Sequence, residues 1–307
     1  MRWPPPLVPG DVVHVVAPSS PFEEGPVRAA LAWLAERYVV RFDAGLFARA
    51  GYLAGDDARR RDELARALGA PDVKAILAAR GGYGASRFAH EIDFAILSRS
   101  PRWIVGFSDI TVLHAEAWRA GVASIHGPHL SALGRADPEV REAFVRILES
   151  PATPRTFSGL STVVSGSHTG TLVGGNLAVL HATAAAGRLA LPAGAVLLLE
   201  DVTERPYRID RMLTTLELGG HLAAVGAVVL GDFTQCDPGA DGITAGEVLF
   251  ERLGRLGVPV VAGLPCGHGE VNEPLVLGGE ARVEGEARVD ASVDRGAAKL
   301  TVRQRAG

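Results

Sequence analysis

Short apolar runs alternate with helical patterns along the first half of the chain. Between the runs, apolar residues recur at helical spacing in residues 25–37, in residues 56–69 and from residue 108 onward. The runs themselves predict strands, and they span residues 11–18, 38–43, 73–80, 103–107 and 122–127. The first of them, like a strand covered on both faces, is almost continuously apolar. Strands that alternate with helices predict an α/β domain with a mostly parallel sheet.

The pattern changes near residue 150. Residues 151–170 are rich in Ser, Thr, Pro and Gly, which is typical of a linker. We therefore expect an N-terminal domain over residues 1–150, a linker over 151–170 and a C-terminal domain over 171–307.

The second domain mixes strands with a clear amphipathic helix. Apolar runs at 194–202 and 225–233 predict two strands, and a helical pattern begins at Pro206 and can end at Gly219. Short β-like segments dominate from Pro274 onward. We predict a smaller α+β domain with much β structure.

Composition and charge exclude several classes of protein. The 307 residues are 47% hydrophobic and 21% charged, so the chain can bury a core and lacks the composition of a disordered protein. The net charge of −4, without a basic stripe, predicts no nucleic-acid partner. No apolar run approaches the roughly 18 residues that cross a bilayer. The first residues also lack the apolar core of a secretory signal. These features predict a cytoplasmic protein with no membrane partner.

The two cysteines, Cys236 and Cys266, are too few for a disulfide framework or a four-thiolate metal site. Cys266 lies close to His268, but a nucleophilic thiol needs an electropositive or helix-start setting. Because Cys266 follows Pro265 in a loop, we expect it to be a small buried residue. The sequence predicts no cofactor.

Ser108 lies where a strand pattern passes directly into a helix pattern, in the segment VGFSDIT. A serine at such a turn is exposed, and the N–H of the next residue can stabilise an oxyanion. The motif is G-x-S-D, however, and a serine here can also be the N-cap of the helix. The local pattern alone favours the cap, so both interpretations stay open.

A glycine-rich turn, RGGYGASR, follows the third predicted strand and spans residues 80–87. Paired glycines let the backbone approach a ligand or expose N–H groups. The motif lacks the third glycine of a dinucleotide fingerprint and the Gly-Lys-Ser/Thr of a phosphate-binding loop. It is either a ligand-binding turn or a tight turn with an incidental Tyr83.

A serine nucleophile needs a base, and the base needs an acid that orients it. His268 is the best candidate base, because a loop histidine between two glycines has little reason to be there for packing. Glu200 and Asp201 end an apolar strand, and strand alternation points their side chains to opposite faces. Only one of them can face a pocket, and an ordinary charged strand end is the alternative.

The other histidines carry weaker signals. We expect His14 to be buried in the core and His114 to be a core residue or part of the wall of the site. His126 and His129 have H-x-x-H spacing, but no third ligand is apparent in the sequence, so we predict no metal site.

Seven motifs, in order along the chain, resemble the LD-carboxypeptidase family, a serine peptidase group that includes the microcin immunity peptidases. The resemblance runs from about Asp11 to about Val283. The motifs are GYLAGDDARRRDEL, VKAILAARGGYGASR, IVGFSDITVLH, IHGPHL, GTLVGGNLAVL, LLLEDVTERPYRIDRML and GLPCGHGEVNEPLVLGG.

The resemblance implies a fold, an assembly and a catalytic triad. The N-terminal domain would be like the class I amidotransferases and the C-terminal domain of the swivelling type, with the site between them and a homodimer as the assembly. The serine of the family's G-[FY]-S-D motif, the glutamate of L-E-D and the histidine of G-H-G fall on Ser108, Glu200 and His268.

The resemblance also implies the substrate and its contacts. The cleaved bond would join the L-centre of a diamino acid to a terminal D-alanine in cytoplasmic muropeptides, as in cell-wall recycling. The N–H of Asp109 and one from the Gly81–Gly82 turn would form the oxyanion hole. Tyr83 is a candidate substrate contact, and Arg87 and Arg211 are candidate partners of the terminal carboxylate.

Two other functions remain as alternatives. A microcin-immunity-type peptidase would cleave a toxic aminoacyl nucleotide, and family members of that type carry a longer loop with an aromatic residue for the base. The stretch from Ser108 to Glu200 is compact here and its only tryptophan is Trp118, so we favour the muropeptide. The third hypothesis is a catalytically inactive ligand-binding protein, which the retention of all three triad residues disfavours.

Overall fold

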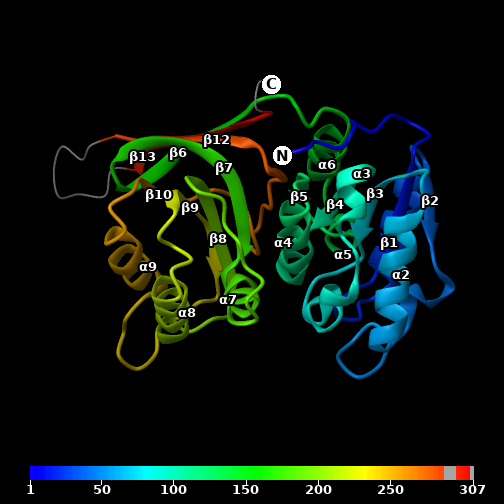
Figure 1. Cartoon of the computed structure of the whole chain (residues 1–307), viewed down its shortest axis with the longest axis horizontal. Coiled ribbons are helices and arrows are strands. Elements are labelled where there is room, and N and C mark those ends of the chain that lie inside the picture. The colour runs from blue at the N-terminus through cyan, green and yellow to red at the C-terminus, as the bar shows by residue number, and fades with distance from the viewer. Residues whose placement is uncertain (287–294, 305–307) are drawn as a thin grey trace. The chain divides into compact units, whose positions relative to one another are not determined.

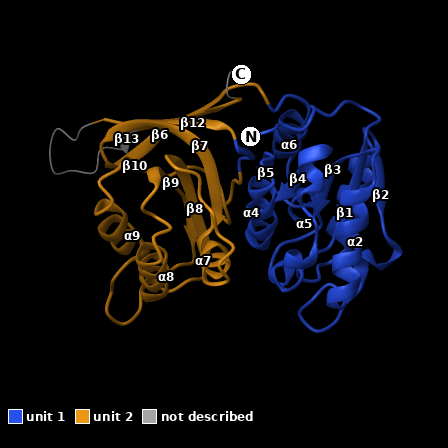
Figure 2. Cartoon of the chain, in the orientation of Figure 1, with its two compact units in different colours: residues 1–151, 273–278 blue, residues 152–272, 279–307 orange. Residues whose placement is uncertain are grey.

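The computed structural model describes residues 1–286 and 295–304 of the chain, with only the backbone described for residues 295–297. The chain divides into two compact units (Figure 2). Unit 1 contains residues 1–151 and 273–278, and unit 2 contains residues 152–272 and the chain from residue 279 onward. Each unit has its own sheet.

Unit 1 is a six-stranded sheet in the order β11-β5-β4-β3-β1-β2 (Figure 1). Its strands are β1 (Val12–Val16), β2 (Val39–Phe42), β3 (Val73–Ala78), β4 (Trp103–Gly106), β5 (Ser124–His126) and β11 (Leu275–Leu277). The first five are parallel to one another, and β11 runs antiparallel to β5. The prediction of a mostly parallel sheet in this half of the chain is confirmed.

Helices follow the strands of unit 1 as βα alternation requires. They are α1 (Glu24–Ala35), α2 (Asp57–Gly69), α3 (Ile96–Arg99), α4 (Thr111–Arg119), α5 (Leu130–Leu133) and α6 (Pro138–Glu149), with 3₁₀ helices η1 (Ala44–Phe47), η2 (Ala85–Arg87), η3 (Ala89–Glu91) and η4 (Ser108–Ile110). The Asp56 side chain caps α2, because it accepts from the Arg59 N–H at 2.7 Å.

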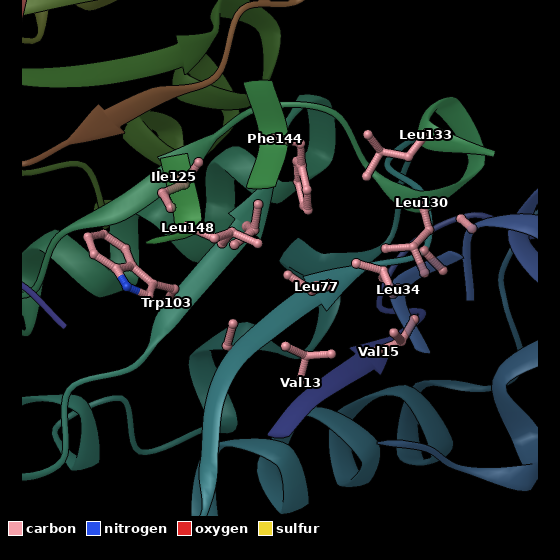
Figure 3. Packing of buried hydrophobic residues seen from close by; sticks show 14 of the residues in the cluster. Val13, Val15, Leu34, Leu77, Trp103, Ile125, Leu130, Leu133, Phe144 and Leu148 are labelled. Atoms are coloured by element: carbon pink, nitrogen blue, oxygen red, sulfur yellow. The ribbon is translucent and has the colours of Figure 1, made fainter. Parts of the chain in front are cut away.

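One face of this sheet builds a continuous apolar core. Alternate residues of the strands point to the same side, as the pleat dictates. They pack against α1, α5 and α6 (Figure 3). The residues labelled there are Val13 and Val15 of β1, Leu77 of β3, Trp103 of β4, Ile125 of β5, Leu34 of α1, Leu130 and Leu133 of α5, and Phe144 and Leu148 of α6. This burial fixes the strand ends that carry Ser108 and the glycine turn.

Unit 2 is a closed barrel with strand order β10-β6-β13-β12-β7-β8-β9. The strands are β6 (Arg155–Val164), β7 (Gly166–Asn176), β8 (Ala195–Val202), β9 (Val225–Thr234), β10 (Val260–Ala262), β12 (Glu280–Gly285) and β13 (Arg295–Arg303). Its helices are α7 (Leu177–Ala185), α8 (Pro206–Leu218) and α9 (Ala245–Gly254). Strands β7, β8, β9 and β10 are mutually parallel, so their carboxyl ends gather at one edge of the barrel.

The predicted linker at 151–170 is wrong. Strand β6 and the first part of β7 occupy it, and β6 pairs with β10 and β13, which lie far along the chain. Much of β6 and the first half of β7 are exposed or half-buried, which explains their Ser and Thr content. The C-terminal boundary also differs, because residues 273–278 return to unit 1 as β11 and interrupt the expected 171–307 domain.

Among the described residues, no helix is both long enough and apolar enough to cross a membrane.

Candidate active site

Ser108 lies at a tight turn after β4, as its position in the sequence predicts. It is half-buried and begins η4, which leads directly into α4. Its φ of 63° is in the left-handed region, which residues other than glycine rarely adopt and which is concentrated at functional sites. The N-cap positions of η4 and α4 are Phe107 and Ile110, with no side-chain cap bond. The cap interpretation of Ser108 is therefore wrong.

The glycine turn after β3 packs directly against this serine. A Cβ on Gly81 would lie 2.8 Å from the Ser108 Cβ and 3.1 Å from its Oγ, so only glycine fits. Gly82 has φ 103°, and a Cβ there would lie 2.5 Å from the Ser20 Oγ. The two glycines thus let the loop backbone approach Ser108 on one side and Ser20 on the other.

The Asp109 side chain ties three strand-end loops together. Its buried carboxylate accepts from the Ser19 hydroxyl at 2.6 Å and from the Ala85 N–H at 2.8 Å. Ser19 follows β1, Ala85 follows β3 and Asp109 follows β4. Burial raises the pKa of Asp109, and the hydrogen bonds and the nearby Arg60 oppose that rise. Only a main-chain role was predicted for Asp109, so these side-chain hydrogen bonds were missed.

His114 supports the same turn from α4. Its Nε2 lies 2.9 Å from the Gly106 carbonyl, which also accepts from the Gly127 N–H at 3.1 Å. Complete burial lowers the pKa of His114 to about 3, so the imidazole is neutral at ordinary pH and donates from Nε2. His114 is thus a core residue, as expected.

The H-x-x-H histidines take part in packing and capping. His129 caps α5 by accepting from the Ala132 N–H, and its ring stacks on Phe107 at 4.8 Å. The rings of His126 and Phe107 pack in an edge-on arrangement with their centroids 5.8 Å apart. Across the part of the chain that the structure describes, no group of three or more His, Cys, Asp or Glu side chains could hold a metal ion.

In unit 2, the structure brings together Glu200 and His268, which are far apart in sequence. The His268 Nδ1 lies 2.7 Å from the Glu200 Oε2, and Glu200 is fully buried near the end of β8. His268 lies in the loop between β10 and β11 and is partly exposed. A buried carboxylate on Nδ1 fixes the imidazole tautomer, so Nε2 is the ring nitrogen that can act as a base.

Asp201 points away from this pair, as strand alternation predicts. Its carboxylate accepts from the Asn176 Nδ2 and the Ala178 N–H, both at 2.9 Å. Asn176 also caps α7 through Val179. Burial raises the pKa of Asp201 to about 6. Asp201 is thus a structural anchor of α7.

A second carboxylate, Asp232, lies beside the pair and was missed by sequence analysis. It is on β9, the parallel neighbour of β8, and accepts from the backbone of Gly269. Partial burial raises its pKa, and the negative charge of Glu200 adds to the rise. The signal that could have found it is an acidic residue at the end of an apolar run, as at Glu200.

Of the remaining candidates, three are on the surface and Cys266 is buried. Tyr83 is exposed and its ring lies 6.1 Å from that of Tyr52. Arg87 pairs with Asp57 at 2.8 Å, and Arg211 is exposed on α8. Cys266 is fully buried, which agrees with its expected role as a packing residue.

Comparisons with known proteins cover both units. Residues 13–127 match the LD-carboxypeptidase N-terminal domain and residues 169–283 match the LD-carboxypeptidase C-terminal domain. The murein tetrapeptide carboxypeptidase of Pseudomonas aeruginosa is 34% identical over 286 residues, which are 89% of this chain and 93% of that protein.

Solved structures have the same fold over nearly the whole chain. The muramoyltetrapeptide carboxypeptidase from Oxalobacter formigenes superimposes with a TM-score of 0.82 at 29% identity, covering 95% of this chain and 99% of that one. The microcin C7 self-immunity protein MccF, in complex with aspartyl sulfamoyl adenosine, gives a TM-score of 0.84 at 20% identity, covering 99% of both chains.

Proposed function

Because this chain belongs to the LD-carboxypeptidase family, we propose that it is a serine carboxypeptidase that releases the terminal D-alanine of murein tetrapeptides. The observation that carries the proposal is the 2.7 Å contact between the His268 Nδ1 and the buried Glu200 carboxylate. This contact has the geometry of a base held by its orienting acid.

In the proposed mechanism, the Ser108 Oγ attacks the carbonyl of the last peptide bond. His268 takes the serine proton on Nε2 and passes it to the leaving amine of D-alanine. Glu200 keeps the other ring nitrogen protonated and stabilises the imidazolium that forms. Water then hydrolyses the acyl-enzyme by the same proton transfers in reverse order.

The oxyanion of each tetrahedral intermediate would bind main-chain N–H groups. We assign these to Asp109, at the start of η4, and to the Gly81–Gly82 turn. The close approach of Gly81 to Ser108 and the bracing of both segments by the Asp109 carboxylate support this assignment. Rigidly held donors stabilise developing charge without reorganisation, which is worth about 10²–10³ in rate per donor.

The substrate assignment follows a relative whose name states its substrate. A murein tetrapeptide carboxypeptidase is 34% identical, whereas MccF is 20% identical and supports the fold alone. The free carboxylate of D-alanine needs a cationic partner, for which Arg87 and Arg211 are candidates and Tyr83 a neighbouring contact. Arg87 would have to exchange or share its ion pair with Asp57.

We further propose that the protein is cytoplasmic, acts in cell-wall recycling as a homodimer, and needs neither metal nor cofactor. Its acidic net charge of −4 and lack of a basic stripe also support the absence of a nucleic-acid partner.

The test is hydrolysis of three tetrapeptides that differ only at the last position: D-Ala, L-Ala and D-Ala amide. We expect release of D-alanine from the first, detected by mass spectrometry, and much slower cleavage of the other two. Inverting the last residue exchanges its methyl and carboxylate positions, and the amide removes the charge, so a charged hydrogen bond is lost in each case. Equal kcat/KM for all three would refute a carboxypeptidase, and turnover of an aminoacyl sulfamoyl adenosine instead would favour the microcin-immunity alternative.

A further inference from the structure

The loop that carries His268 has no helix or strand of its own between β10 and β11. Its geometry therefore depends on the contacts that individual residues make. The Gly267 N–H donates to the Asn272 Oδ1 at 3.1 Å, and the Cys266 carbonyl accepts from the Asp232 N–H at 2.9 Å. The second of these bonds joins the loop to β9.

The two glycines that flank His268 each face a carboxylate. A Cβ on Gly267 would lie 2.7 Å from the Glu200 Oε2, and a Cβ on Gly269 would lie 2.3 Å from the Asp232 Oδ2. Neither position has room for a side chain, because the loop backbone lies directly on the two acids. The G-H-G pattern is therefore a consequence of packing the loop between two acidic side chains.

The two carboxylates contact different parts of the loop. Glu200 contacts the imidazole itself, through Nδ1. Asp232 accepts from the backbone of Gly269, the residue after the histidine, while its own N–H donates to Cys266, two residues before it. Asp232 thus forms hydrogen bonds with the loop on both sides of His268.

Holding a second carboxylate beside Glu200 is unfavourable in itself. Partial burial raises the pKa of Asp232 and the charge of Glu200 raises it further, whereas the Gly269 hydrogen bond and His268 lower it. These are the charged groups that face Asp232 from β8 and from the loop. The hydrogen bond to Gly269 is the larger of the two interactions that oppose this rise.

We propose that Asp232 is a positioning residue, whose carboxylate oxygen fixes the His268 loop through the Gly269 N–H and so keeps the imidazole on Glu200. The role requires a hydrogen-bond acceptor and not a charge. This inference rests on the proposed function for its kinetic test, but its structural test needs no substrate.

Three variants separate the acceptor from the charge. Asp232→Ala removes both, Asp232→Asn keeps an amide oxygen that can accept the Gly269 N–H, and Asp237→Ala removes an exposed aspartate from the segment after β9 as a matched control. We expect Asp232→Ala to lower kcat about 10- to 100-fold with KM within about twofold, as for other misplaced catalytic groups. Asp232→Asn should stay within about threefold of the unchanged protein in kcat, and Asp237→Ala should equal it.

Proton NMR without substrate gives the independent readout. The Nδ1–H proton of His268, bound to Glu200, should give a downfield signal that is identified by its loss in His268→Gln. We expect this signal in the unchanged protein, in Asp232→Asn and in Asp237→Ala, and its broadening or loss in Asp232→Ala. An intact signal in Asp232→Ala, or an Asn variant as slow as the Ala variant, would overturn the proposal. If the unchanged protein cleaved no tetrapeptide, the proposed function would fail while the NMR comparison still decided the role of Asp232.

Discussion

The Ser108 turn of unit 1 and the His268 loop of unit 2 hold their key side chains in different ways. Ser108 is positioned by backbone geometry: a positive φ, a glycine turn packed against it and a buried Asp109 that ties neighbouring loops. His268 is positioned by side chains, because its loop has no regular structure and is held by hydrogen bonds to Glu200 and Asp232. Both lie at the carboxyl edge of parallel strands, where open α/β sheets generally place their sites.

This difference predicts how the geometry of each region responds to substitutions. A backbone-built turn should survive deletion of the reactive atom, because its position comes from the backbone, the packed glycine turn and the Asp109 side chain. A loop held by carboxylates should lose its geometry when an acceptor is removed, because each acid contacts it directly. The predictions that follow test this contrast, from the largest effect to the smallest.

The largest effect is expected from Ser108→Ala. We expect unchanged folding by circular dichroism and loss of about 10⁶-fold in kcat, the size seen when a serine peptidase loses its nucleophile. The physical reason is that the turn is fixed by neighbours of Ser108 and not by its hydroxyl. Activity within tenfold of the unchanged protein would rule out Ser108 as the nucleophile.

The second prediction contrasts Glu200 with its neighbour Asp201. Glu200→Gln should lower kcat about 10⁴-fold, because an amide no longer enforces the reactive imidazole tautomer. Asp201→Asn should leave kcat nearly unchanged, because Asp201 contacts Asn176 and Ala178 on the other side of the strand. Steady-state kinetics on both variants decides between them. A larger loss of kcat in folded Asp201→Asn would reverse the assignment.

A smaller effect is expected at the glycine turn of unit 1. In Gly81→Ala, the new methyl would lie 2.8 Å from the Ser108 Cβ, so the turn must move away from the serine. We expect kcat to fall about 10²–10³-fold, as for loss of one oxyanion-hole donor. Gly69→Ala is the control, because a Cβ there meets nothing within 4 Å. Equal kcat in the two variants would show that the Gly81–Gly82 turn contributes no donor to the oxyanion hole.

The smallest effect concerns stability and pH at Asp201. Its pKa is raised from 3.8 to about 6, so the folded protein holds this proton more tightly than the unfolded chain does. The resulting stabilisation is fully present below about pH 4 and is lost as pH rises through about 6. Urea unfolding across this range should show a decline of up to about 3 kcal/mol that is flattened in Asp201→Asn. An identical pH dependence in the variant would contradict the assignment.

The same contrast explains what the sequence could predict. Strands β1, β3, β4 and β5 were found because burial on both faces leaves continuous apolar runs, a local signal. Strand β2, at the edge of the sheet and mostly exposed, was found from its short apolar run alone. The Ser108 turn was likewise found from a local signal, since its strand and helix patterns adjoin. Strands β6 and β7 were mistaken for a linker because they lie partly in solvent and pair with β10, β12 and β13, far along the chain.

Contacts between distant residues were the least predictable part of the candidate site. The resemblance to a known family linked Glu200 with His268, whereas the strand pattern alone left open whether either acid is more than a charged strand end. Asp232 was missed because its importance depends on β9 lying beside β8 and on a loop that follows β10. The brace made by the Asp109 side chain was missed because Ser19 and Ala85 are distant in sequence and meet only in the folded sheet.

The most direct test of the central claim is the rate at which a fluorophosphonate labels Ser108. The serine oxygen bonds to phosphorus and fluoride leaves, so labelling reports nucleophile activation without any peptide substrate. We predict that peptide mapping places the label on Ser108, and that Glu200→Gln and His268→Gln slow labelling by at least about 100-fold. Labelling of Ser108 at an unchanged rate in these two variants would show that the Glu200–His268 pair does not activate the serine.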